Sequence, residues 1–165
     1  MEYSVEHRFS HDVDKVFRLF FDLERIRQKN EALGCRDLSI EKCELIGTKG
    51  EIKLSRMMSA SGEIPRPLRK FHKEWNQVTQ IENWEILNDG AKRCHYRVII
   101  DGVPARIEGH MFLSPTARGS SNKVSIKVSS KVPLIGKTIA DFICADSALQ
   151  IENEYQAILR QLKSE

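Results

Sequence analysis

Residues 123–163 read KVSIKVSSKVPLIGKTIADFICADSALQIENEYQAILRQLK, and this stretch decides the fold. At its start, apolar Val124, Ile126 and Val128 alternate with lysine and serine. This alternation predicts a strand with one wet face near residues 122–132. After Pro133 the apolar positions recur at helical spacing, which predicts a helix to about Lys163. A helix of this length extends roughly 40 Å, enough to cross a whole sheet.

The middle of the chain carries the same alternation in shorter pieces. Glycine, asparagine, aspartate and proline separate these pieces, and short links of this kind join antiparallel strands. Asp101-Gly102 predicts a tight hairpin. The longer link at 59–76 predicts a short helix around Pro67 to Lys73. The expected strands lie near residues 36–46, 50–59, 77–87, 92–101 and 104–114.

The first third of the chain begins with a strand and continues into helices. Apolar and polar side chains alternate from Tyr3 to Phe9, which predicts a strand. Ser10 or Asp12 can cap a helix whose apolar positions begin at Val13. A second short helix is expected over 23–33, before a glycine suited to a helix C-terminus.

Together these elements predict a single α+β domain over residues 1–165. A sheet cannot leave its apolar face exposed, and the last helix is the one late element able to cover it. Seven strands also carry more twist than a flat sheet tolerates. We therefore expect a helix-grip fold: a seven-stranded curved antiparallel sheet wrapped around a long C-terminal helix, with two short helices after the first strand. Space for a ligand between sheet and helix is an expected consequence.

Composition and motifs exclude several classes of function. The net charge of +3 is too small to indicate a nucleic acid as partner. The four cysteines are far apart, which argues against a structural zinc site and a disulfide framework, and no metal or cofactor is expected. No signal peptide and no apolar run of about 20 residues is found, so a cytoplasmic location is expected.

Six short motifs carry a resemblance to a known superfamily. They are Tyr3-Ser4-Val5-Glu6-His7, Glu31-Ala32-Leu33-Gly34, Ile64-Pro65, Glu82-Asn83-Trp84-Glu85, Val103-Pro104 and Val132-Pro133-Leu134-Ile135-Gly136-Lys137. In these stretches the chain resembles the START-like, or helix-grip, superfamily that includes polyketide cyclase-like proteins. Within it, the chain is most similar to an uncharacterised bacterial START-like family. The resemblance implies a cavity and a small apolar or amphipathic ligand, and it transfers no catalytic motif.

Polar residues on apolar faces are the informative candidates, because burial without partners is costly. Arg56 and Glu82 lie on neighbouring expected strands, and we predict an Arg56–Glu82 pair inside the cavity that orients a ligand carboxylate or hydroxyl. A structural ion pair, or an arginine that reaches water at the sheet edge, is the alternative. The predicted cavity residues are His7, Arg56, Met58, Glu82, Trp84, Tyr96, Met111, Phe142, Asp146 and Leu149. Core packing would explain the apolar members equally well.

His7 is the one histidine on a clearly apolar strand face. Its ordinary pKa lies near neutrality, so it is a candidate general acid or base together with Asp146 or Glu82. A hydrogen-bonded core histidine is the alternative. Asp146 interrupts the apolar stripe of the long helix, and a small rotation of that helix would turn it to solvent instead. Cys94 and Cys144 fall on expected buried faces and are predicted to be inert.

The segment 66–75 combines four basic residues with apolar ones. Arg66, Arg69, Lys70 and Lys73 beside Leu68, Phe71 and Trp75 suit a transient contact with a membrane surface or a partner. A solvated basic face over a buried apolar stripe is the alternative.

Three functions are therefore compared. The first is a non-catalytic carrier or sensor of a lipid-like or aromatic small molecule. The second is an enzyme of the cyclase or dehydratase kind that uses the same cavity. The third is an interaction module built on segment 66–75, without a ligand. The sequence does not indicate the oligomeric state.

Overall fold

The structure is a computed structural model that describes residues 1–164. Glu165, the last residue of the predicted domain, lies outside the described residues. The elements run in the order β1 (Glu2–Phe9), α1 (Val13–Phe20), α2 (Leu23–Ala32), β2 (Arg36–Ile46), β3 (Lys49–Ser59), a 3₁₀ turn (Arg66–Leu68), β4 (Trp75–Ile86), β5 (Lys92–Ile100), β6 (Arg106–Thr116), β7 (Gly119–Ser129) and α3 (Gly136–Lys163). No helix in this part of the chain is long and apolar enough to cross a membrane.

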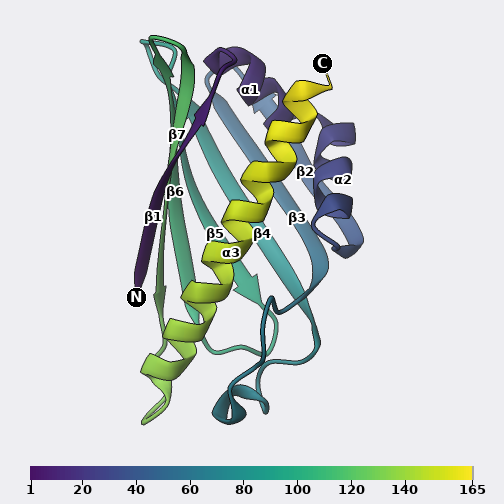
Figure 1. Cartoon of the computed structure of the whole chain (residues 1–165), viewed down its shortest axis with the longest axis vertical. Helices are drawn as coiled ribbons and strands as arrows, with labels where there is room; N and C mark the ends of the chain where they lie inside the picture. Colours follow the sequence, from purple (N-terminus) through teal and green to yellow (C-terminus); the bar gives the residue numbers. More distant parts are fainter. Residues whose placement is uncertain (165) are drawn as a thin grey trace.

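All seven strands form one antiparallel sheet in the order β1-β7-β6-β5-β4-β3-β2. The sheet curves, and α3 crosses its concave face diagonally (Figure 1). The fold class and topology predicted from the sequence are therefore confirmed. The two edge strands β1 and β2 lie on opposite sides of α3, and α2 lies on the β2 side of the helix (Figure 1).

The two short helices begin where polar caps allow them to. The Asp12 carboxylate accepts a hydrogen bond from the Lys15 backbone N–H at 2.8 Å, and Asp22 does the same for Arg25 at 3.0 Å. Each cap satisfies a backbone donor that the first helical turn leaves unpaired. Gly34 follows α2 with φ of 75°, a left-handed conformation that glycine adopts without strain.

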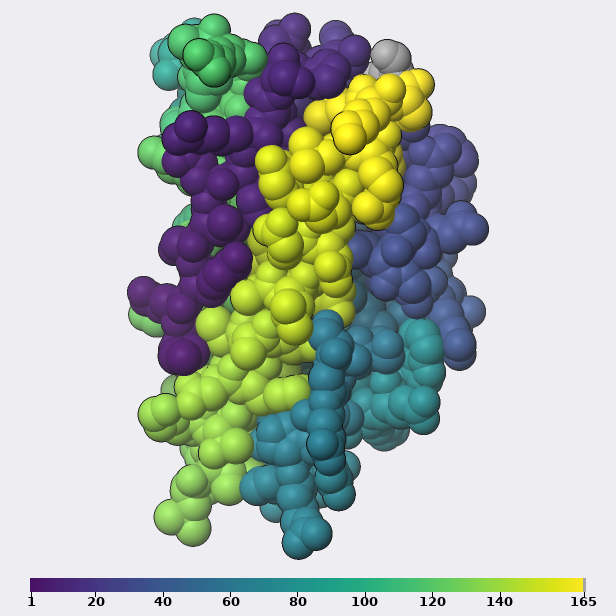
Figure 2. Space-filling view, in the orientation of Figure 1, coloured from purple at the N-terminus to yellow at the C-terminus, as the bar shows by residue number. Residues whose placement is uncertain are grey.

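The long helix packs against the core at its two ends. Figure 2 shows α3 lodged between β1 and α2. Ile139 and Ile143 near its start and Ile158 and Leu162 near its end are buried in the core. Over the twelve described residues from Ala145 to Gln156, however, no side chain of α3 is fully buried. The middle of the helix therefore stands over the sheet without filling the space beneath it.

Three local expectations were wrong. β5 ends at Ile100 and β6 starts at Arg106, so Asp101-Gly102 begins a longer connection and does not close a two-residue hairpin. Pro104 has no backbone N–H and cannot join the ladder there. β7 spans Gly119–Ser129, three residues earlier than expected.

The expected helix around Pro67 to Lys73 is only the 3₁₀ turn Arg66–Leu68. The backbone N–H groups of Leu68, Arg69 and Phe71 bond to carbonyls only three residues earlier, which is the 3₁₀ pattern rather than the α-helical one. The turn nevertheless carries Leu68 into the core, where 1% of its surface is exposed.

Candidate functional site

A cavity of about 140 Å³ lies between the concave face of the sheet and the middle of α3. Most of its wall is apolar, with Ile107 and Met111 on β6 and Val124 and Ile126 on β7. Engineered apolar cavities of roughly 150 Å³ hold a benzene molecule, whereas pockets for drug-sized ligands run to roughly 300–1,000 Å³. In this conformation the cavity therefore suits a compact ligand about one ring in size.

Three side chains give the cavity a polar end. Arg56 on β3 donates hydrogen bonds from Nη1 to Asn30 Oδ1 on α2 and from Nη2 to Gln80 Oε1 on β4, the latter at 3.3 Å. The Asn30 amide in turn donates to the Ile26 carbonyl at 2.8 Å, which turns its oxygen toward Arg56. Gln80 and Asn30 thus hold the guanidinium in one orientation.

Glu82 is the terminal acceptor of this network. Its carboxylate accepts hydrogen bonds from Gln80 Nε2 at 2.6 Å and from Trp84 Nε1 at 2.8 Å. Burial raises the pKa of Glu82, and this effect outweighs the attraction of Lys29 and the two hydrogen bonds. The pair predicted between Arg56 and Glu82 is wrong as a direct contact, because Gln80 bridges the two. The register explains this, since Arg56 faces Val78 and Glu82 faces Ile52.

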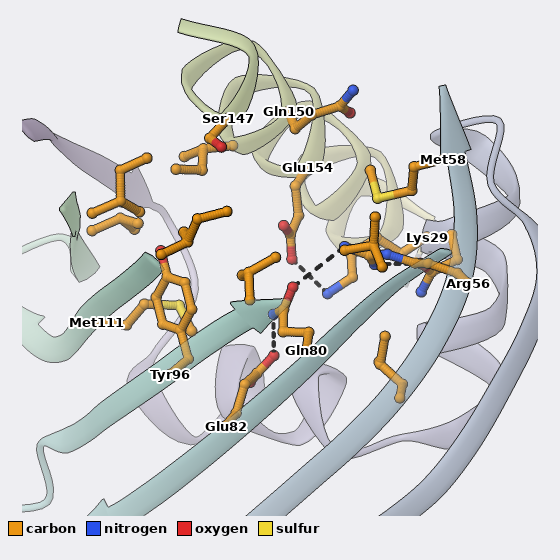
Figure 3. A pocket seen from close by; sticks show the side chains of 18 of the residues that line it. Lys29, Arg56, Met58, Gln80, Glu82, Tyr96, Met111, Ser147, Gln150 and Glu154 are labelled. Carbon is orange, nitrogen blue, oxygen red and sulfur yellow. Dashed lines mark hydrogen bonds and ion pairs between the residues drawn. The ribbon is translucent and has the colours of Figure 1, made fainter. Parts of the chain in front are cut away.

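An ion pair joins α2 and α3 above the cavity. Lys29 Nζ on α2 lies 2.8 Å from Glu154 Oε1 on α3. Figure 3 shows Glu154 reaching down from α3 toward Lys29, with Arg56 and Gln80 beside them and Tyr96 and Met111 across the cavity. Burial alone would raise the pKa of Glu154, but Lys29, Arg56 and His7 together hold it below its usual value.

The opposite wall places His7 of β1 beside α3. The His7 ring stacks on the Tyr155 ring, and its Nε2 lies 3.4 Å from a Glu152 carboxylate oxygen. Burial lowers the pKa of His7, and the attraction of Glu152 and Glu154 only partly offsets this. The partners expected for an acid–base pair were wrong, because Asp146 accepts a hydrogen bond from the Ser61 backbone N–H at 2.6 Å and Glu82 is bound by Gln80 and Trp84.

Two buried polar atoms at the cavity wall, Arg56 Nε and Asn122 Oδ1, have no hydrogen-bond partner among the described residues. A third, His7 Nε2, has only its 3.4 Å contact with Glu152. His7 and Asn122 are cross-strand neighbours in the β1–β7 ladder, whereas Arg56 lies at the other end of the cavity. Buried polar atoms are usually satisfied, so such atoms around one cavity mark positions where a bound molecule can donate or accept.

Eight of the ten residues predicted for the cavity lie at its wall. His7, Arg56, Met58, Glu82, Trp84, Tyr96, Met111 and Asp146 all line it. Phe142 does not, because it packs edge-on against the buried His72 ring. Leu149 is wrong as a cavity residue, since 54% of its surface is exposed on the outer side of α3.

Several cavity residues were missed. Lys29 and Asn30 lie on α2 and Asn122 lies on β7, and nothing in the sequence pairs them. A signal was present on α3, however. Ser147, Gln150 and Glu154 follow the buried Ile143 at intervals of three and four, so they continue its inward face as a polar stripe.

The cysteines lie outside the cavity, and His72 is the one residue of segment 66–75 among the described lining residues. All four cysteines are free thiols, and Cys94 and Cys144 are buried as predicted. In segment 66–75 the four basic side chains are exposed while Leu68 points into the core, which is the arrangement of a solvated basic face. Membrane contact through Arg66, Arg69, Lys70 and Lys73 stays a prediction. No cluster of three or more metal-ligating side chains occurs within residues 1–164.

The curved sheet, the long helix across it and the cavity between them define a START-like helix-grip fold. The chain belongs to the family described as protein of unknown function DUF2505, whose sequence model matches residues 4–162. No curated protein matches the sequence at a significant level.

Solved structures share the fold at low sequence identity. A STAR-related lipid transfer protein from Xanthomonas axonopodis is 18% identical, with 93% of this chain and 85% of that chain covered and a TM-score of 0.54. Norcoclaurine synthase from Thalictrum flavum is 14% identical, with 100% and 86% covered and a TM-score of 0.57. Ara h 8.0201 is 12% identical, with 100% and 99% covered and a TM-score of 0.62. At these identities the likeness shows the fold alone.

Proposed function

We propose that the protein binds a compact amphipathic small molecule between α3 and the sheet, as a carrier or sensor without catalysis. The observation that carries this proposal is the cavity itself, with an apolar wall and two buried polar atoms, Arg56 Nε and Asn122 Oδ1, that have no partner among the described residues. Apolar area drives such a molecule out of water, and a few polar groups orient it.

The polar network supports binding more than chemistry. Arg56, Gln80 and Glu82 are linked to one another, and Lys29 is paired with Glu154. A general acid or base needs a partner group aimed at the same reacting atom. His7, Asp146 and Glu82 were predicted for that role, but the structure describes no hydrogen bond or ion pair between any two of them. The names of two structural neighbours, a lipid transfer protein and a synthase, fit either use of such a cavity. Bacterial origin and a cytoplasmic location stay predictions.

The first test is native mass spectrometry of the protein purified from its own host, followed by extraction and identification of the bound molecule. We expect an apolar or amphipathic adduct at one molecule per chain. A protein that carries no adduct and also binds no aromatic probe would contradict the proposal and direct attention to segment 66–75.

A pair of variants ties the adduct to the cavity. Val124→Phe adds bulk to a buried wall residue, whereas Leu149→Phe adds the same type of ring on the exposed side of α3. We expect Val124→Phe to abolish the adduct and Leu149→Phe to keep it. Thermal unfolding of both variants verifies that each is folded. An adduct retained at full occupancy in a folded Val124→Phe protein would place the ligand elsewhere.

A further inference from the structure

Arg56 is a buried cation without a carboxylate on its guanidinium. Only 8% of its surface is exposed, and its two hydrogen bonds go to the neutral side-chain amides of Asn30 and Gln80. A buried charge is normally paired with an opposite charge. Gln80 stands between Arg56 and Glu82 in the hydrogen-bond chain, and Glu154 is already bound by Lys29 at 2.8 Å.

The guanidinium also has donors to spare. Of the five N–H donors of an arginine, two are used by Asn30 and Gln80, and Nε has no partner in the described part of the chain. Nε and a neighbouring Nη can present two parallel N–H groups along one edge. That edge matches the two oxygens of a carboxylate.

The charges around this end of the cavity favour an anion. Lys29 and Arg56 are two cations, and Glu154 is one carboxylate that they hold ionised. Gln80 separates Glu82 from the guanidinium, because its side chain hydrogen-bonds to both. The Arg56 guanidinium at the α2–β3 wall is therefore left without a carboxylate in direct contact with it.

The two sides of the cavity differ in polarity. Arg56 and Lys29 lie on one side of it, and Tyr96 and Met111 lie on the other (Figure 3). The far wall is completed by Ile107, Val124 and Ile126. An elongated ligand would therefore be oriented with its charged group toward β3 and its apolar body toward β5, β6 and β7.

We propose that the ligand is a compact monocarboxylic acid, aromatic or branched-alkyl in its body, whose carboxylate is held by Arg56 through the Nε edge. Asn30 and Gln80 act as positioning residues that keep this edge turned to the cavity. The proposal rests on the proposed function, because it names the chemical class of the molecule bound in that cavity.

The test compares two probes that differ only in the head group, phenylacetate and 2-phenylethanol. Calorimetry gives the affinities, and the side-chain amide signals of Asn30 and Gln80 in nitrogen-15 spectra report where the head group lies. We expect wild type to bind the acid at least about tenfold more tightly than the alcohol. We also expect the acid, and much less the alcohol, to shift both amide signals.

Variants separate the charge from the fold. Arg56→Gln should remove the preference for the acid and leave the affinity for the alcohol within about threefold, whereas Arg97→Gln, at an exposed position of β5, should change neither. Arg56→Lys keeps the charge without the planar edge and should retain only part of the preference. If Arg56→Gln does not fold, Arg56→Lys and the wild-type comparison decide the matter.

The outcomes distinguish this proposal from the proposed function. Equal affinities of wild type for acid and alcohol would overturn the carboxylate assignment while leaving ligand binding intact. The same conclusion would follow if Arg56→Gln weakened both probes alike. Failure of wild type to bind either probe would overturn both.

Discussion

The ring of Tyr155 on α3 stacks on the ring of His7 on β1, with ring centroids 4.0 Å apart and planes inclined by 2°. The Tyr155 hydroxyl donates a hydrogen bond to the Arg8 carbonyl at 2.7 Å, so the same side chain makes two separate contacts with β1. This contact fastens the middle of α3 to the edge of the sheet and closes one side of the cavity. Because burial lowers the pKa of His7, the stacked ring is neutral near pH 7.

Acidification should weaken this contact. Unfolded His7 takes up a proton as the pH falls through about 6.5, whereas the folded protein resists protonation until a lower pH. The free energy of unfolding therefore decreases as the pH falls below about 6.5, until the folded pKa is passed. His7→Phe keeps a ring for Tyr155 and should show a shallower decrease between pH 7 and pH 5, measured by urea unfolding. His95→Gln, on the outer face of β5, serves as control, and an unchanged pH profile in His7→Phe would refute the prediction.

Glu82 should make the folded protein less stable as the pH rises, which is the opposite of the effect of His7. An unfolded glutamate ionises above about pH 4.5, but burial raises the pKa of folded Glu82, so ionisation of the unfolded state lowers stability as the pH rises above 4.5. Glu82→Gln has no carboxyl group at this position, so it lacks this pH-dependent loss of stability. We expect the stability of the variant relative to wild type to improve as the pH rises above about 4.5, until the pKa of folded Glu82 is passed, in denaturant titrations. The exposed Glu31→Gln variant should show no such trend, and a constant difference for Glu82→Gln would argue against a raised pKa.

Gly109 makes room for Tyr96 at the cavity wall. The two residues face each other in the β5–β6 ladder, and a methyl group on Gly109 would lie within 2.2–2.5 Å of the Tyr96 ring and hydroxyl. Gly109→Ala should push the ring into the cavity, lower stability by about 1–3 kcal/mol and reduce the affinity for aromatic probes. Gly62→Ala, at a position with open space around it, is the matched control. Full probe affinity in Gly109→Ala would show that the ring moves away from the cavity instead.

The connection from β3 to the 3₁₀ turn is held against α3 by Ser61. Its backbone N–H donates to Asp146, and Gln150 Nε2 donates to its hydroxyl at 2.9 Å. This segment lies along the side of the lower half of α3 in Figure 2, next to the cavity residues Ser59 and Ala60. We expect ligand entry to require its release.

Asp146→Ala should therefore speed both binding and release of a probe by roughly two- to tenfold, which corresponds to the loss of one hydrogen bond of about 0.5–1.5 kcal/mol. Stopped-flow fluorescence measures these rates. Asp141→Ala removes another α3 carboxylate, paired only with Lys137 in the described structure, and should leave the rates unchanged. Equal rates in Asp146→Ala and wild type would show that the ligand enters by another route.

The site was harder to predict than the fold, and particular residues show why. Leu149 was assigned inward because it continues an apolar run, yet a helical residue two positions from Ser147 lies on nearly the opposite face. Glu154 was not assigned at all, although its spacing from Ile143 and Ser147 places it inward. On β3 and β4, by contrast, Arg56 and Glu82 were assigned to the correct face, and only the register between the strands was needed to separate them.

The sequence by itself determined the class of protein, because strand alternation, helix caps and turn residues are local signals that a few neighbouring side chains carry. Asp12, Asp22 and Gly34 set the boundaries of the short helices in this way, and Val124 to Val128 identified the last strand. Only the tertiary structure decided which polar groups meet. Lys29 and Glu154 are 125 residues apart, and His7 and Tyr155 are 148 apart. Such contacts depend on the register of the strands and on the rotation of α3 about its axis. A register shift of one residue would replace each buried side chain of a strand by a solvent-facing neighbour.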